Sequence, residues 1–120
     1  MPTLETTTYL RESTHEWQSC IEACVECWLA CEMCSDACLD EENVEAMVRC
    51  IRLDRECAEM CQTAARAMVR GSDEAKAICR LCAEICDRCG EECARHEADH
   101  CQACAEACRR SAEECRKMAA

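Results

Sequence analysis

The stretch from Cys20 to Cys38 reads CIEACVECWLACEMCSDAC. Its six cysteines follow one another at steps of four, three, four, three and four residues. This is the spacing of side chains on the buried face of a helix, where leucine or isoleucine normally packs into a bundle core. The stretch therefore predicts one helix with a row of thiols on its buried face, at Cys20, Cys24, Cys27, Cys31, Cys34 and Cys38.

The composition of the whole chain favours an all-α fold. The 120 residues include one proline, two glycines and no phenylalanine, whereas alanine, glutamate and arginine are good helix formers. A chain of this length forms one domain and can bury a core. We expect residues 13–120 to form a single four-helix-bundle domain, preceded by a polar tail or short helix over residues 1–12.

Turn and capping signals divide the chain into four predicted helices. We expect them over about residues 14–39, 44–70, 72–96 and 99–120, with Gly71 as the C-cap of the second helix. Capping-box spacing marks the starts of the first and fourth helices. Four helices joined by short connections predict an antiparallel up-and-down bundle.

The other three predicted helices also have cysteines on one face. Together with the first helix they account for all 18 cysteines of the chain. The positions are Cys50, Cys57 and Cys61 on the second helix, Cys79, Cys82, Cys86, Cys89 and Cys93 on the third, and Cys101, Cys104, Cys108 and Cys115 on the fourth. The pattern predicts a bundle lumen lined with sulfur.

Several classes of function are disfavoured by composition. No apolar run is long enough to span a membrane, and the N-terminus has no secretory signal pattern. We therefore expect a cytoplasmic protein with reduced thiols rather than disulfides. Cysteines three or four apart on a helix also close into disulfides only with strain. The formal charge of −11 argues against nucleic acid or anionic membranes as partners.

Thiols on continuous helices favour Cu(I) over other soft metals. Sulfur ligands select Cu(I), zinc or iron–sulfur clusters, but zinc sites group their ligands in fours and clusters need a wider pocket. Each Cu(I) displaces one thiol proton, which leaves a filled core near neutral, whereas one Zn(II) per thiol leaves a large buried charge. We predict about one Cu(I) per thiol, with a few zinc ions per bundle as the alternative.

Polar side chains gather at one predicted end of the bundle. The antiparallel arrangement places His96, His100, Met47 and Asn43 around Cys38, and imidazole and thioether groups are exchangeable Cu(I) ligands. We interpret this end as the mouth through which Cu(I) enters. The alternative is that the two histidines simply end two helices at a solvated tip.

Two oxygen-bearing residues interrupt the thiol rows. Asp54 occupies a core position, where it is a hydrogen-bond acceptor, a weak ligand or half of an ion pair with an arginine; we favour a structural role beside the ligands. Ser111 is expected to pack or to bond to the backbone. Second apolar stripes are interpreted either as core packing or as a contact between subunits, and include Trp17, Trp28, Ile78, Leu81 and Ile85.

Three segments resemble the bacterial cytosolic copper storage proteins. They are CIRLDREC (50–57), HEADHCQAC (96–104) and CRKMAA (115–120), and the resemblance extends over about residues 19–120. It implies a four-helix bundle that assembles into a homotetramer and stores many Cu(I) ions on inward-pointing cysteines. It also implies histidine ligands at the open end, which correspond to His96 and His100. Relatives can carry cysteine where Ser111 stands, so one site is altered or missing here.

The function predicted from these observations is Cu(I) storage rather than catalysis. No nucleophile with an adjacent base and no phosphate-binding loop is visible. The alternatives are a helical metallothionein for zinc, a thiol redox enzyme with exposed low-pKa cysteines, and a structural bundle that uses cysteine as a small hydrophobe. Slow reaction of buried thiols with thiol reagents separates storage from redox chemistry.

Overall fold

The computed structural model describes residues 10–120, with the side chain of Ser13 excepted, and most of these residues are helical. The predictions for residues 1–9 lie outside the described part. The elements are η1 (Glu12–Trp17), α1 (Gln18–Cys38), η2 (Val44–Met47), α2 (Val48–Arg70), α3 (Ala75–Ala94) and α4 (Asp99–Ala119). Among the described residues, no helix combines the length and apolar character needed to cross a bilayer.

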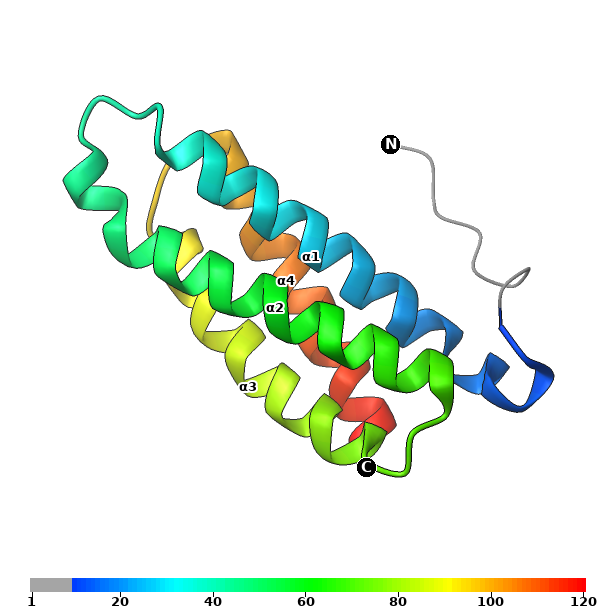
Figure 1. Cartoon of the computed structure of the whole chain (residues 1–120). Helices are drawn as coiled ribbons and strands as arrows, with labels where there is room; N and C mark the ends of the chain where they lie inside the picture. Colours follow the sequence, from blue (N-terminus) through cyan, green and yellow to red (C-terminus); the bar gives the residue numbers. More distant parts are fainter. Residues whose placement is uncertain (1–9) are drawn as a thin grey trace.

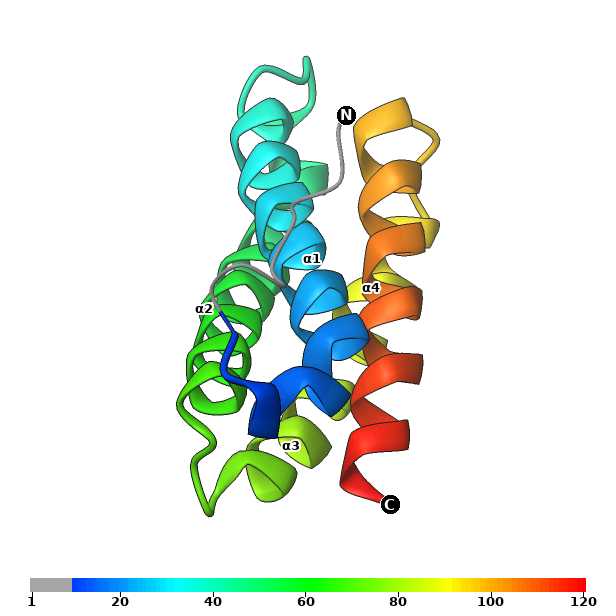
Figure 2. The ribbon, with the colours of Figure 1, turned by 90° about the vertical axis from the view of Figure 1, so that its right-hand side faces the viewer.

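The four α-helices form the predicted up-and-down bundle (Figure 1). α1 packs against α2 and α4, and α3 packs against the same two helices. Figure 2 shows α1 and α4 side by side, with the turn after α1 and the start of α4 at the same end. The end of α1, the start of α2, the end of α3 and the start of α4 therefore share one end, which we call the mouth.

The first helix begins later than predicted. Residues Glu12–Trp17 form the 3-10 segment η1, and the α-helix starts at Gln18. Thr14 is buried in this segment and its Oγ1 donates to the carbonyl oxygen of Arg11 over 2.9 Å. The guanidinium of Arg11 in turn donates to the carbonyl of Arg70 over 3.0 Å. These bonds tie η1 to the end of α2, at the end opposite the mouth, which we call the closed end.

The predicted glycine cap of α2 is confirmed. Gly71 has φ +66°, and the amide of Ser72 donates to the carbonyl of Ala67 over 2.9 Å, as in a Schellman motif. The predicted capping box of α4 is wrong, because no side chain caps that helix. Gln102 Nε2 donates instead to the carbonyls of Ala94 and His96 over 3.2 and 2.7 Å, which fastens the end of α3 to α4.

The core consists largely of cysteine and alanine. All 18 cysteines are free thiols and none is more than 1% exposed, which confirms the inward orientation predicted from spacing. Gly90 allows α3 and α4 to approach closely, because a Cβ there would lie 3.2 Å from Cys108 Cβ. Of the second apolar stripes, Ile85 is buried, whereas Trp17 and Trp28 are half-buried against the core and Leu81 is exposed.

Candidate metal centre

Thiols from different helices meet along the axis of the bundle. Cys50 on α2 and Cys93 on α3 have their sulfurs 3.6 Å apart, and Cys27 on α1 and Cys108 on α4 have theirs 3.7 Å apart. These distances are those of thiol–thiol hydrogen bonds and far exceed the length of a disulfide, about 2.05 Å. The helical spacing of three and four residues thus produces a continuous sulfur-lined interior.

Sulfur atoms gather in sets that suit a soft metal ion. Within each set the candidate ligand atoms lie within 4.8 Å of one another, and sets share members. Since a metal–thiolate bond is about 2.3 Å long, two sulfurs on opposite sides of an ion lie about 4.6 Å apart. Shared members allow one sulfur to bridge two ions. The sets include Cys27/Cys57/Cys61/Cys86, Cys27/Cys31/Cys57/Cys108, Cys31/Cys89/Cys104/Cys108, Cys34/Cys38/Cys50/Cys101 and Cys34/Asp54/Cys93/Cys104.

Asp54 lies inside the thiol network with no exposed surface. Its Oδ1 accepts from the thiols of Cys89, Cys93 and Cys104 over 3.2, 3.3 and 3.4 Å, and its Oδ2 accepts from Cys50 over 3.7 Å. Burial, and then the neighbouring Cys104 and Cys50, raise the pKa of this carboxyl to about 8. In the described part of the chain no arginine forms an ion pair with it, and in the metal-free core its contacts are hydrogen bonds with thiols.

The thiols at the mouth differ in how readily they ionise. Burial is the largest cause that raises the pKa of Cys101, to about 11, and it also raises the pKa of Cys38. Hydrogen bonds from Cys34 and Cys93 lower the pKa of Cys50 to about 2. Burial and thiol–thiol hydrogen bonds therefore act in opposite directions on the thiols at the mouth.

His100 contacts the thiols at the mouth directly. Its Nδ1 lies 3.4 Å from Cys34 Sγ and 3.6 Å from Cys101 Sγ, and its Nε2 lies 3.0 Å from Glu41 Oε1. An ionised carboxylate only accepts hydrogen bonds, so Nε2 donates to it. This bond leaves the Nδ1 lone pair facing the two sulfurs, which is the arrangement in which a carboxylate orients a metal-binding histidine.

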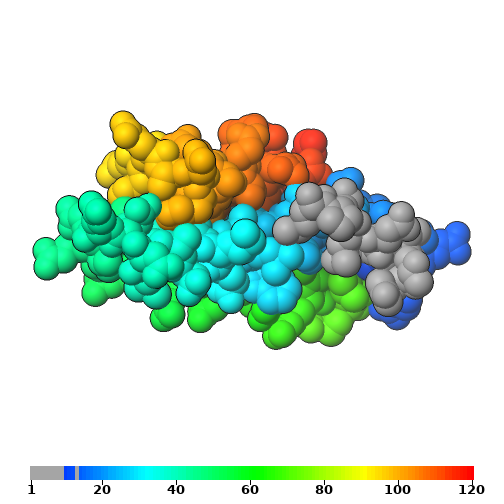
Figure 3. Space-filling view, turned by 90° about the horizontal axis from the view of Figure 1, so that it is seen from above, coloured from blue at the N-terminus to red at the C-terminus, as the bar shows by residue number. Residues whose placement is uncertain are grey.

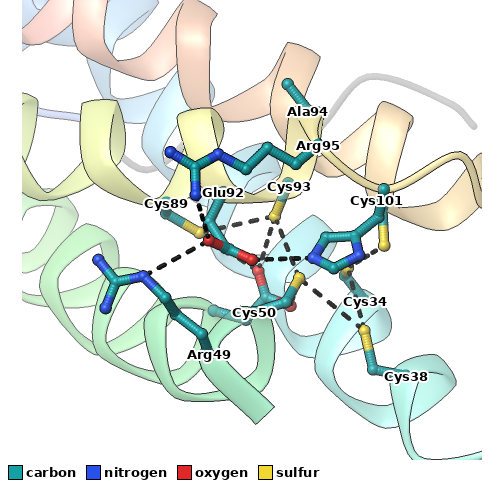
Figure 4. A network of polar contacts seen from close by, with 12 residues as sticks. Cys34, Cys38, Arg49, Cys50, Cys89, Glu92, Cys93, Ala94, Arg95 and Cys101 are labelled. Carbon is teal, nitrogen blue, oxygen red and sulfur yellow. Dashed lines mark hydrogen bonds and ion pairs between the residues drawn. The ribbon is translucent and has the colours of Figure 1, made fainter. Parts of the chain in front are cut away.

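His96 is held differently. Its Nε2 lies 2.9 Å from Glu92 Oε2, while Glu92 Oε1 pairs with Arg49 and Arg95 over 3.4 and 3.6 Å. Figure 4 shows the carboxylate of Glu92 between these two arginines, beside Cys50 and Cys93. The structure therefore brings His100 onto the thiols, and fastens His96 to a mostly buried carboxylate next to them.

The remaining mouth residues are placed unequally. Met47 is buried at the start of α2, at the same end as Cys38. Asn43 is exposed at the start of η2, where its side chain makes no capping hydrogen bond. The turn after α1, in teal, and the start of α4, in yellow-orange, lie together at this end in Figure 3. His15 is exposed in η1, near the closed end.

Sequence reasoning missed two carboxylates and did not identify the partners of one hydroxyl. Glu92 is four residues before His96 on one helix, so its pairing was visible in the spacing. Glu41 is 59 residues from His100 and gave no local signal. Of the two expectations for Ser111, packing is confirmed and a backbone bond is not: its fully buried Oγ contacts the thiols of three other helices.

Comparison with known proteins agrees with this geometry. A sequence model described as copper storage protein (Csp) matches residues 13–120. A Bacillus subtilis (strain 168) protein named uncharacterized cysteine-rich protein YhjQ is 53% identical over 103 residues, which cover 86% of this chain and 95% of that protein.

Two solved structures share the fold. The Cu(I)-bound copper storage protein BsCsp3 has a TM-score of 0.83 and 53% identity, with 86% of this chain and 97% of that chain covered. A cytosolic copper storage protein from Streptomyces lividans, solved with five coppers, has a TM-score of 0.84 and 40% identity, with 88% and 93% covered. The chain belongs to the copper storage protein family.

Proposed function

We propose that this protein stores Cu(I) in the cytoplasm, bound to cysteine thiolates inside the bundle. The observation that carries the proposal is the set of 18 buried, free thiols arranged in overlapping groups of ligand size. The similar proteins named as Cu(I)-bound or copper-loaded support it. The storage domain corresponds to residues 13–120, and all 18 cysteines are its proposed ligands.

Charge balance supports a monovalent ion and a high capacity. Each Cu(I) that replaces a thiol proton leaves the core charge unchanged, so the cost of burying charge does not accumulate as the lumen fills. With two sulfurs per ion and two ions per sulfur, the capacity is about one Cu(I) per thiol. We therefore expect on the order of 18 ions per chain, with proton release at each step.

We propose the mouth as the route for Cu(I). His100 presents Nδ1 to Cys34 and Cys101, and such a ligand exchanges faster than a thiolate. His96 and the thioether of Met47 are proposed as further transient ligands, and Asn43 as a weak one. At the closed end, the contacts between η1 and the end of α2 cover the bundle instead.

We further propose that the chain assembles into a homotetramer. Large apolar side chains are exposed on the outside of the bundle, including Met33 at 63% and Leu81 at 47%. Exposed apolar side chains of this size can be covered by contacts between subunits. Light scattering on the purified protein should then give about 54 kDa, four times the chain mass of 13.5 kDa; a monomer mass would contradict the assembly and leave storage untouched.

The decisive experiment is an anaerobic titration of the reduced, metal-free protein with Cu(I) against a competing chelator. We expect uptake to continue to about one Cu(I) per thiol. A parallel titration with Zn(II) tests the alternative. If Zn(II) saturates at about four ions and little Cu(I) is taken up, a zinc-binding metallothionein is favoured instead. Far-ultraviolet circular dichroism should be the same before and after loading, because the core buries well without metal.

A further inference from the structure

His96 is held at the mouth through both its backbone and its ring. Its amide donates to the carbonyl of Cys93 over 3.1 Å, and its own carbonyl accepts from Gln102 Nε2 over 2.7 Å. Its ring nitrogen Nε2 lies 2.9 Å from Oε2 of Glu92, one turn earlier on α3. With the main chain fixed, the orientation of the ring depends on its bond to Glu92.

The carboxylate of Glu92 is itself held by two cations. Its Oε1 lies 3.4 Å from Nε of Arg49 on α2 and 3.6 Å from Nη1 of Arg95. The side chain of Glu92 is 9% exposed, whereas that of Glu41, which serves the other mouth histidine, is 38% exposed. Burying a carboxylate is costly unless it is paired, so the two arginines stabilise Glu92 in the place where it meets His96.

The bond to Glu92 determines which nitrogen of His96 is free. An ionised carboxylate only accepts hydrogen bonds, so Nε2 must be the nitrogen that carries the hydrogen. A neutral imidazole has one N–H, which leaves a lone pair on Nδ1. In the described part of the chain, Nδ1 of His96 has no hydrogen-bond partner. A carboxylate on one ring nitrogen and a free lone pair on the other is the arrangement of a metal-binding histidine.

His96 lies beside a pair of thiols from two helices. Cys50 on α2 and Cys93 on α3 have their sulfurs 3.6 Å apart, and Figure 4 shows both beside the carboxylate of Glu92. Hydrogen bonds from Cys34 and Cys93 lower the pKa of Cys50 most, and the nearby His96 lowers it further. The imidazole and this thiol pair are therefore neighbours at the mouth.

We propose that Glu92 is a positioning residue for Cu(I) transfer at the mouth and that it acts through His96. It holds the ring so that Nδ1 is available to an incoming ion, which then passes to Cys50 and Cys93. The mouth thus has a second histidine position besides His100, and the two lead to different pairs of thiols. This inference rests on the proposed storage function.

The test is a double-mutant cycle on the rate of Cu(I) uptake from a Cu(I)–chelator complex under anaerobic conditions. All variants also carry His100→Phe, so that His96 is the remaining mouth histidine. Glutamine keeps the size of Glu92, but its amide can also donate to the ring, so the Nε2–H form is no longer enforced. Glu92→Gln should slow uptake by about ten-fold. The same substitution should have no further effect once His96→Phe is present.

The neighbouring Glu91 provides a matched control. Its side chain is exposed, so Glu91→Gln removes one carboxylate from the same part of α3 and should leave the uptake rate unchanged. If Glu92→Gln leaves the rate unchanged, or slows uptake equally with and without His96, storage stands and the positioning role is wrong. If the wild type takes up few Cu(I) ions, the storage function itself fails.

A spectroscopic measurement decides the case in which Glu92→Gln fails to fold, as judged by circular dichroism. Nitrogen-15 NMR of the metal-free wild type, at about pH 8 to lie above the ordinary titration of histidine, reports which ring nitrogen of His96 carries the hydrogen. We expect the hydrogen on Nε2 alone. A ring with a hydrogen on Nδ1 would overturn the inference.

Discussion

Replacing Asp54 with asparagine should change how the stability of the metal-free protein depends on pH. Asparagine keeps the size of the side chain and an oxygen that accepts from the thiols of Cys89, Cys93 and Cys104. It removes the ability to ionise in a position with no exposed surface. The substitution therefore isolates the contribution of one buried charge.

The sign and size of the effect follow from the pKa of Asp54. Burial raises the pKa from 3.8 to about 8 in the folded protein, so between these values the native state holds a proton that the unfolded state has lost. The contribution of Asp54 to stability is therefore greatest below pH 4 and is lost as the pH rises through 8. A shift of about four units at about 1.4 kcal/mol each sets an upper bound of about 6 kcal/mol. Since buried sites relax and admit water, we expect at least about 2 kcal/mol.

The measurement is urea unfolding of reduced, metal-free protein at pH 5 and pH 8. From pH 5 to pH 8, the wild type should lose at least about 2 kcal/mol more than Asp54→Asn. The exposed Asp36 provides a matched control, because Asp36→Asn also removes one carboxylate and should follow the wild type. If Asp54→Asn and the wild type lose the same stability between the two pH values, the assignment of a protonated Asp54 in the empty core is refuted.

Three further predictions concern the mouth and a helix cap. Replacing both His96 and His100 by phenylalanine should slow Cu(I) transfer to and from a chelator and leave most of the capacity intact. The control variant His15→Phe should transfer copper like the wild type. Equal transfer rates in all three proteins would contradict the mouth assignment. Glu41→Gln should weaken the hydrogen bond at His100 Nε2 and lower the population of the Nε2–H tautomer, which nitrogen-15 NMR measures. An unchanged tautomer population would show that the carboxylate of Glu41 does not determine the tautomer. Gly71→Ala should lower the free energy of unfolding by about 1 kcal/mol because of its φ of +66°, and an unchanged melting temperature would argue against strain there.

Side-chain direction along a helix is the part of this structure that sequence predicts best. Whether a residue faces the core depends on its position within a turn of 3.6 residues, which is a local property. The spacing of cysteines therefore predicted that all 18 point inward, and the structure confirms it. The same reasoning placed Gly71 at the end of α2, because a helix that ends in the left-handed region favours glycine.

Contacts between distant residues were beyond the sequence patterns. Glu41 reaches His100 only because the turn after α1 and the start of α4 meet at the mouth. Gln102 had the spacing of a capping box but bonds to the end of α3, since the break between α3 and α4 places the carbonyls of Ala94 and His96 within its reach. Ser111 was expected to pack or to bond to the backbone; it packs in the core, and the thiols of three neighbouring helices satisfy its hydroxyl. In each case the partner was set by the packing of helices, which the local pattern does not specify.

The use of cysteine as a core residue explains how one bundle can be stable both empty and filled. A protonated thiol packs as a small apolar group, so the metal-free core meets the ordinary requirements of burial. Each Cu(I) replaces a proton without adding net charge, so filling the core does not require the helices to separate. The oxygens of Asp54 and Ser111 behave differently from the thiols. In the empty core, surrounding thiols form hydrogen bonds with them, and these bonds lose their donors when the thiols ionise. The two residues therefore mark the levels at which loading changes the hydrogen bonding of the core most, and we expect the first structural differences between empty and filled protein at these levels.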